Sequence, residues 1–467
     1  MGWRRSVVPN RDRTADGLWA PERRALTLGL VLTITLVAFE ALAVVTIMPD
    51  VARSLGGIHL YGWAFSAFLL GCMIGIVAAG READRWGLAR PYIAGLSVFS
   101  AGLVVAGLAP SMAVLVVGRS LQGLGAGAVP AVAYVAIGRS FPELLRARMM
   151  AVMSTAWVVP GVVGPLLSAG VAHLFGWRWV FLGLLPLVAL TGVLALPGLA
   201  GLGRPDKPPE KEHRLVDAVM AAAGTGLVIG GLTTGRPLVA LPVAAVGVAI
   251  LLPALRRLVP PGTLVARPGL PATILSRGML TFAYFGADAF VTLAIVTVRH
   301  HSLAAASLAV TGSTLGWTAG AWTQARFNQR WEGRRLVRLG LTLLMLGGCG
   351  MLAVLQPGVP VAVAYLAWSI AGLGMGLAYA PISLMMLREA PPGGEGWASA
   401  SLNLSDVLGS ALGAGLGGAA IALGATQGWA LSTGVAVAFA LPTVMAVAAL
   451  VVSGRLPVRG AHPAVEA

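Results

Sequence analysis

Long apolar runs, separated by short polar segments, recur along the whole chain. A membrane-spanning helix needs about 20 mostly apolar residues, and the pattern predicts fourteen such helices. The predicted spans begin near Ala25, Leu60, Arg90, Met112, Ala147, Trp177, Arg214, Pro237, Ala272, Ser302, Leu336, Pro360, Trp397 and Gly428. The expected fold class is therefore an all-α membrane protein.

The composition agrees with this expectation. Hydrophobic residues make up 57% of the 467 residues, charged residues only 11%, and the mean hydropathy is +0.83. Soluble domains carry about a quarter charged residues. The net charge of +15 does not indicate nucleic-acid binding, because the basic residues form short clusters between apolar runs instead of one basic face. The bilayer is the expected partner.

The basic residues predict the orientation of the spans. Cytoplasmic segments of membrane proteins are enriched in Lys and Arg. With a cytoplasmic N-terminus, all but five of the 33 Lys and Arg residues fall in cytoplasmic segments. The exceptions are Arg53, Arg119, Arg178, Arg236 and Arg299. The first apolar run, from Ala25 to Pro49, is too long for a signal peptide. We therefore expect a multi-pass protein of a bacterial inner membrane, with both termini in the cytoplasm.

An internal repeat divides the chain. Ser120–Gly127 reads SLQGLGAG, and the similar SIAGLGMG of Ser369–Gly376 follows 249 residues later. Glu40 and Asp288 are related by an offset of 248. Two parallel six-helix halves are typical of two-lobed transporters. The expected organisation is a basic tail (1–24), an N-terminal bundle (25–200), a linker with two helices (201–271), a C-terminal bundle (272–453) and a second tail (454–467).

The segment after the second predicted span carries a recognisable motif. It has glycine, three residues, Asp-Arg, one residue, glycine and then a basic residue, at Gly80, Asp84, Arg85, Gly87 and Arg90. This order resembles the loop signature of the major facilitator superfamily. The resemblance implies that these residues act in conformational gating.

Two further motifs are similar to the same superfamily. The fourth span holds Arg119, Gln122 and a glycine series, similar to the superfamily's motif with a buried arginine. The fifth span holds Gly161, Gly164 and Pro165, similar to the antiporter motif, although Ser168-Ala169 replace its paired glycines. Fourteen spans with a two-helix linker resemble the branch of drug:proton antiporters. The resemblance implies two six-helix bundles around a central cavity and transport by alternating access.

Four charged residues lie inside predicted spans, namely Glu40, Arg119, Asp288 and Asp406. Charge inside the bilayer is costly, so each is a candidate for proton coupling. We favour Glu40 as the proton carrier, because Arg119 in the same half could reset it. Arg119 could instead bind substrate. The acids could also simply lock helices together, and Asp406 could belong to a structural cluster with Asn403 and Ser405.

Aromatic residues accompany two of the acids. Tyr284 lies one helical turn before Asp288, and an aromatic face beside an acid suits a lipophilic cation. Asp288 is therefore our candidate for binding substrate, although such aromatics could be plain packing. The predicted substrate cavity comprises Phe39, Gln122, Tyr284, Phe285, Phe290 and Asn403.

The function expected from these observations is proton-coupled export of small amphipathic or drug-like compounds. The sequence holds no enzymatic constellation and no phosphate-binding Gly-Lys-Ser/Thr, so protons or sodium remain as the energy source. We expect no cofactor, no metal and a monomer. Export of a lipid or a dedicated metabolite is one alternative, and a non-transporting receptor or scaffold is another.

Overall fold

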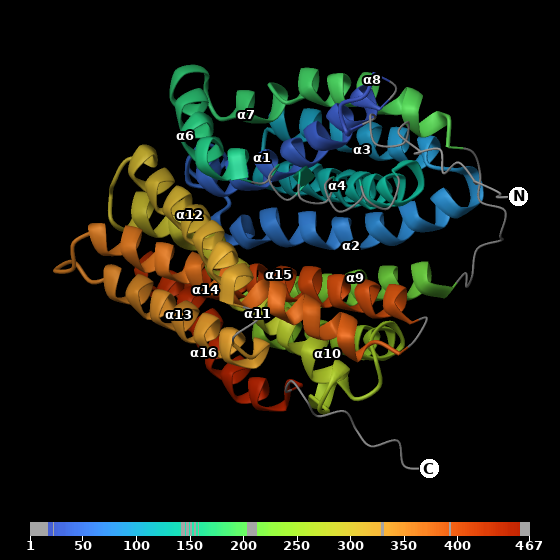
Figure 1. The fold of residues 1–467 in the computed structure, drawn as a ribbon. Helices are drawn as coiled ribbons and strands as arrows, with labels where there is room; N and C mark the ends of the chain where they lie inside the picture. The colour runs from blue at the N-terminus through green and yellow to red at the C-terminus, as the bar shows by residue number, and fades with distance from the viewer. Residues whose placement is uncertain are drawn as a thin grey trace, which may run out of the picture.

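The computed structural model describes residues 17–457, except 22, 142–144, 146–148, 150–151, 154–155, 157, 203–212, 328–330 and 392–393. Its elements are helices connected by short turns, and no strand occurs among the described residues. Figure 1 shows the helices lying side by side in a bundle. The all-α expectation is confirmed.

The first half contains α1 (Arg24–Leu55), η2 (Ile58–Leu60), α2 (Tyr61–Trp86), α3 (Ala89–Gly107), α4 (Met112–Ser140), α6 (Val158–Phe175), α7 (Arg178–Leu182) and α8 (Leu185–Ala200). The linker contains α9 (His213–Thr233), α10 (Pro237–Leu258) and η3 (Thr263–Val265). The second half contains α11 (Leu270–Leu293), η4 (Ala294–Val298), α12 (Leu303–Phe327), α13 (Gly333–Val354), α14 (Ala362–Glu389), α15 (Glu395–Thr426), α16 (Leu431–Val452) and η5 (Ser453–Arg455).

Twelve helical segments of the described chain are long and apolar enough to cross a membrane. The chain is thus a multi-pass membrane protein. The predicted number was fourteen. The two remaining predicted spans correspond to α6, whose described apolar segment Val159–Phe175 is short, and to α12, which contains many small and hydroxyl residues.

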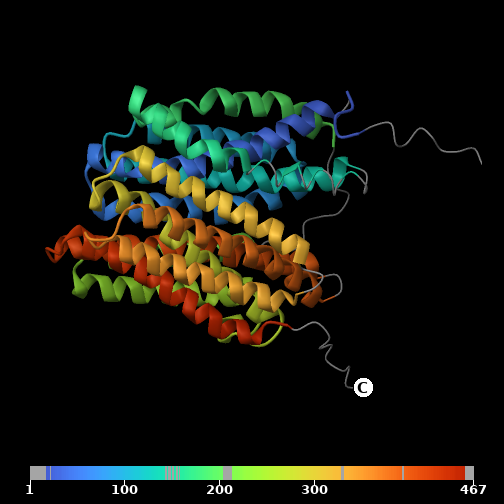
Figure 2. The ribbon, with the colours of Figure 1, turned by 60° about the vertical axis from the view of Figure 1, so that its left-hand side comes forward.

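Helix packing repeats between the two halves. In the first half α4 packs on α2 and α3, and α1 packs on α6 and α8; in the second half α14 packs on α12 and α13, and α11 packs on α15 and α16. Figure 2 shows the first half, blue to green, lying over the second half, yellow to red. The halves meet where α2 packs on α15 and where α6 packs on α12.

The repeated glycines explain why the same helices pair in both halves. A Cβ atom on Gly123 would lie 1.9 Å from the carbonyl oxygen of Phe68 on α2. At the equivalent place, a Cβ atom on Gly372 would lie 2.0 Å from the carbonyl oxygen of Ser313 on α12. Only a residue without a side chain permits such close backbone contact between membrane helices. The SLQGLGAG and SIAGLGMG segments are therefore packing motifs.

The linker helices lie along the seam between the halves. α9 packs on α10 and also on α2 and α15. The indole N–H of Trp63 on α2 donates to the hydroxyl of Thr233 at 3.3 Å, and Arg257 pairs with Asp217 at 3.3 Å. Asp217 therefore binds α10 from the second turn of α9.

Candidate functional site

Glu40 lies near the middle of α1 and is fully buried, with 1% of its surface exposed. Its carboxylate forms an ion pair with Arg119 of α4, which is equally buried. The same guanidinium donates to Gln122 at 2.5 Å and to the carbonyl oxygen of Ala64 at 3.0 Å, and it lies over the Phe68 ring. Of the two roles open for Arg119, the structure favours the partner of Glu40.

Asp288 of α11 makes the equivalent contact with a different partner. The indole N–H of Trp368 on α14 donates to its carboxylate at 2.8 Å. Trp368 lies 249 residues after Arg119, so the same two repeat positions meet in each half. The acid of the first half is bound by a cation, whereas the acid of the second half is bound by a neutral donor. No hydrogen bond joins Glu40 and Asp288 among the described residues.

Aromatic rings surround Asp288 on the side of α12 and α14. Tyr284 stacks on Trp368 with ring centroids 5.5 Å apart, and its hydroxyl shares a hydrogen bond of 2.6 Å with Ser313. Trp317 of α12 packs edge-on against Tyr284 at 5.4 Å and contacts Phe285 at 6.1 Å. Trp317 also contacts the ring of Tyr379, at 5.5 Å. Three of these rings, Phe285, Trp317 and Tyr379, retain partial exposure.

The aromatic rings beside Asp288 extend to Asp406, the third acid inside a predicted span. The hydroxyl of Tyr379 donates to the carboxylate of Asp406 on α15 at 2.7 Å. Arg277 of α11 lies 3.8 Å from the same carboxylate and stacks on the Tyr379 ring. Asp288 and Asp406 are thus linked through Trp368, Tyr284, Trp317 and Tyr379.

This network corrects two expectations from the sequence. Arg277 was counted among the cytoplasmic basic residues, but it lies in the second turn of α11 and is 3% exposed. Asp406 was considered with Asn403 and Ser405. Its partners come instead from α11 and α14, while Asn403 is exposed and Ser405 donates to the carbonyl oxygen of Ile274. The span boundary near Ala272 could have revealed Arg277, because it places this residue inside the helix.

The remaining predicted residues occupy several places. Gly80, Asp84 and Arg85 belong to the last turns of α2, so only Gly87 and Leu88 form the turn before Arg90 of α3. The segment was expected to be a loop, but its Arg, Glu and Ala residues are good helix formers and extend α2. The side chain of Asp84 lies outside the described residues.

The α6 motif lies at two interfaces. A Cβ atom on Gly161 would lie 2.0 Å from Thr314 of α12, so this glycine permits close contact between the halves. A Cβ atom on Gly164 would lie 3.5 Å from the Phe39 ring of α1. Pro165 follows inside α6, and its carbonyl oxygen accepts from Ser168 at 3.0 Å.

Hydrogen bonds join the two halves at one end of the bundle. This end lies opposite to the start of α1 and the end of α16. Thr292 donates to the carbonyl oxygen of Val45 at 2.6 Å, and Ser66 donates to that of Ala411 at 2.9 Å. Phe290 is fully buried against the ring of Tyr61, 5.8 Å away. It therefore contributes to a contact between the halves.

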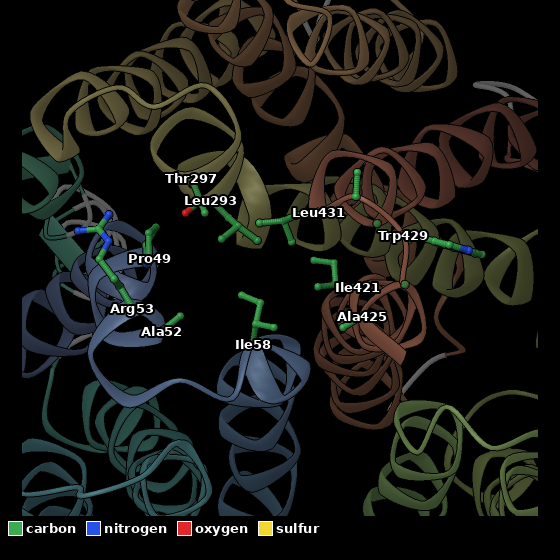
Figure 3. A pocket seen from close by; sticks show the side chains of 13 residues that line it. Pro49, Ala52, Arg53, Ile58, Leu293, Thr297, Ile421, Ala425, Trp429 and Leu431 are labelled. Carbon is green, nitrogen blue, oxygen red and sulfur yellow. The ribbon is translucent and has the colours of Figure 1, made fainter. Parts of the chain in front are cut away.

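A cavity of about 330 Å³ lies at this same end. Figure 3 shows Ile58 of the first half and Leu293, Ile421 and Leu431 of the second half around one space. The pocket also includes Arg53, which pairs with Asp50 at 3.0 Å. This cavity is formed by both halves and is mainly apolar.

Two repeated helical halves, joined at a seam and holding charged groups inside the membrane, define the class of a secondary transporter. The chain belongs to the major facilitator superfamily, whose family model matches residues 30–414.

The chain is 28% identical over 439 residues to a probable multidrug-efflux transporter of Mycobacterium tuberculosis (strain CDC 1551 / Oshkosh), covering 90% of this chain and 92% of the relative. It is 27% identical over 403 residues to the multidrug resistance protein Stp of the same strain, covering 83% and 74% of the two chains.

Among solved structures, an auto-inhibited peptide transporter of the POT family superposes with a TM-score of 0.68 at 17% identity, covering 94% of this chain and 99% of that one. A bacterial homologue of the human lysosomal transporter Spinster, in an inward-facing and unoccupied conformation, gives a TM-score of 0.64 at 15% identity, covering 93% and 98%. These likenesses concern the fold.

Proposed function

We propose that the protein is a proton-coupled exporter of small amphipathic, drug-like compounds, with fourteen membrane helices and both termini in the cytoplasm. The names of the multidrug-efflux relatives support the substrate class. The single observation that carries the proposal is that the two repeat-related acids have partners of different charge. Glu40 is bound by a cation, and Asp288 by a neutral donor.

Glu40 is the proposed proton carrier. A carboxylate paired with an arginine loses that ion pair when it is protonated, and the arginine can re-form the pair after the proton leaves. Arg119 also contacts α2 through Ala64, so a change at Glu40 reaches the helix that packs on the second half. Protonation would thus be coupled to the contact between the halves.

Asp288 is the proposed anchor for a cationic group of the substrate. Trp368 supplies a hydrogen bond but no positive charge, so an ionised Asp288 keeps a net charge available to a ligand. The partially exposed rings of Phe285, Trp317 and Tyr379 provide apolar and cation–π contacts beside it. Asp406 is already close to Arg277, which makes it a less available second anchor.

Alternating access requires the seam between the halves to open and close. The bonds that join Thr292 to Val45 and Ser66 to Ala411 lie at the end opposite to the termini. We propose that the structure represents the state closed at that end, and that transport breaks these bonds. A substrate would then leave on the side where the cavity around Ile58 and Leu293 lies.

The proposal is tested in proteoliposomes that hold the purified protein, with ethidium as a cationic probe and an imposed proton gradient. We expect uphill movement of ethidium that an uncoupler abolishes. Glu40→Gln should lose uphill movement but keep binding, whereas Asp288→Asn should bind ethidium at least tenfold more weakly. Uphill transport that survives the uncoupler, or that both variants retain with wild-type pH dependence, would refute the coupling mechanism.

A further inference from the structure

A groove crosses the outer surface of the first half between α6 and α8. It has a volume of about 560 Å³, within the range of small-molecule sites. Its floor is α1, at Thr35, Leu36 and Phe39, and its walls include Leu167 of α6 and Leu187 of α8. The wall residues Leu167, Phe175 and Trp179 are half or more exposed (50%, 67% and 56%), so the groove opens on the surface that faces the bilayer.

The equivalent helices of the second half pack differently. There α15 and α16 pack on each other and both cover α11, whereas α6 and α8 each cover α1 but barely touch among the described residues. The positions equivalent to Thr35 and Phe39, 248 residues later, are Ala283 and Ala287. Both alanines are 2% exposed. The two halves therefore cover their equivalent helices, α1 and α11, differently.

The lining indicates the chemistry of the occupant. Of the described residues that line the groove, none is charged, and the hydroxyl of Ser168 already donates to the carbonyl oxygen of Pro165 at 3.0 Å. A ligand with several polar groups would leave them without partners, which is costly in an apolar site. A hydrocarbon chain requires no hydrogen bonds and gains close packing.

The length of the groove matches one leaflet. From Leu167 to Phe175 the α6 wall rises about 12 Å at 1.5 Å per residue. Half of a bilayer's hydrocarbon core is about 15 Å. Trp179, at the outer end of the groove, is a residue type that concentrates at the membrane interface. Phe39, at the inner end, lies beside Glu40 near the middle of α1.

We propose that an acyl chain of a membrane lipid occupies this groove and covers α1 where α15 and α16 cover α11. The lipid belongs to the leaflet at the end opposite to the termini, and the end of its chain packs on Phe39. The site does not depend on the transported substrate or on proton coupling.

The test uses a phosphatidylcholine with a diazirine at the end of one acyl chain, in proteoliposomes otherwise made of unlabelled phosphatidylcholine. No residue of α1 from Gly29 to Ala52 is exposed, so only a chain inside the groove can label this helix strongly. We expect labelling of the α1 peptide that contains Thr35 and Phe39, together with labelling of exposed Val193 on α8. Labelling of α1 no higher than that of the α11 peptide with Ala283 and Ala287 would overturn the proposal.

Two neighbouring residues provide a matched pair of variants. Leu167→Trp fills the groove and should lower α1 labelling at least tenfold relative to Val193. Leu166→Trp, at an exposed position outside the groove, should leave it unchanged. If Leu167→Trp does not fold, Val171→Trp fills the same groove. Equal labelling in the groove-filling and control variants contradicts the proposal. A second test adds a competitor during labelling. If tetraphenylphosphonium lowers the labelling of α1 and an excess of unlabelled lipid does not, the groove is a site for a solute and the proposal is wrong.

Discussion

The two halves of the molecule hold equivalent acids in equivalent places, but the acids have different partners. Glu40 and Arg119 form a fully buried ion pair, whereas among the described residues Asp288 accepts a hydrogen bond from the neutral indole N–H of Trp368. The residues around the partners of the two acids also differ between the halves. Arg119 is bonded to Gln122 and Ala64 within the first half, and Trp368 is part of an aromatic cluster with Tyr284 and Trp317.

In the proposed mechanism, this difference separates proton coupling from substrate binding. A charge-neutral pair changes its net charge only when a proton arrives, so it suits a switch. An acid with a neutral partner keeps a charge that a cationic ligand can use. Because equivalent helices pair in both halves, we expect that exchange of one residue on α4 or α14 changes the role of the acid on the facing helix.

Removal of Arg119 should have the largest effect on stability. In Arg119→Met the buried Glu40 loses its ion pair, and breaking a buried pair costs about 3–5 kcal/mol. We expect a strong fall in the thermal unfolding temperature of the purified protein. Trp368→Phe removes the hydrogen bond to Asp288 and part of a buried ring, but no ion pair, and should cost less, about 1–3 kcal/mol. The double variant Glu40→Gln/Arg119→Met should recover much of the loss. Similar losses for Arg119→Met and Trp368→Phe would mean that the two acids are held alike.

Substitution of the packing glycines should affect both halves equally, because the framework is shared. Gly123→Ala and Gly372→Ala each place a Cβ atom about 2 Å from a backbone oxygen of the neighbouring helix. Overpacking of this kind costs about 1–3 kcal/mol. The thermal unfolding temperature should therefore fall by similar amounts in the two variants. Gly170→Ala is the control, since a Cβ atom there meets nothing within 4 Å. A large loss in one half alone would contradict the equivalence of α4 and α14.

Trp368→Arg makes the second half resemble the first. The new guanidinium should neutralise Asp288, so the affinity for ethidium should fall at least tenfold, or about 1.4 kcal/mol, while the protein remains folded. Trp368→Phe is the matched control and should keep most of the affinity. Equilibrium binding to the purified protein provides the measurement. Wild-type affinity in Trp368→Arg would show that the charge of Asp288 does not bind the cation.

Much of this arrangement could be predicted from the sequence, because membrane helices and their repeat leave direct patterns. Apolar runs located the helices, and the shared glycine series related α4 to α14. The candidate partner of Glu40 was also found, since Arg119 was one of very few charges inside a span. The family was recognised from Gly80, Asp84, Arg85, Gly87 and Arg90.

The aromatic partners of Asp288 and Asp406 could not be found in the same way. Trp368 and Tyr379 are uncharged residues in long apolar helices, where an aromatic side chain is usually a packing residue. Their hydrogen bonds depend on the rotation of α14 toward α11 and α15, which local sequence does not specify. The equivalence of Arg119 and Trp368 was present in the repeat, but chemically different side chains hid it. The groove beside Phe39 depends on the separation of α6 from α8 and left no pattern.

The smallest expected effect concerns the turn after α2. This helix packs on α15 of the second half, so we expect a change at its end to reach the contact between the halves. We expect Arg85→Ala and Asp84→Asn to slow turnover severalfold while substrate affinity stays within twofold, because they change the populations of the two access states and not the ligand contacts. Transport rates and equilibrium binding, measured on the same preparations, separate these quantities.

The second half supplies a matched control for Arg85→Ala. Arg334 lies 249 residues after Arg85, but its guanidinium donates to the carbonyl oxygen of Ser453 at 2.9 Å, within its own half. A contact inside one rigid half does not change when the halves move, so Arg334→Ala should leave turnover unchanged. If Arg334→Ala slows transport as much as Arg85→Ala, the effect reflects general loss of charge at the membrane surface, and the end of α2 has no special part in gating. A large fall in affinity in well-folded Asp84→Asn would place that residue in substrate binding instead.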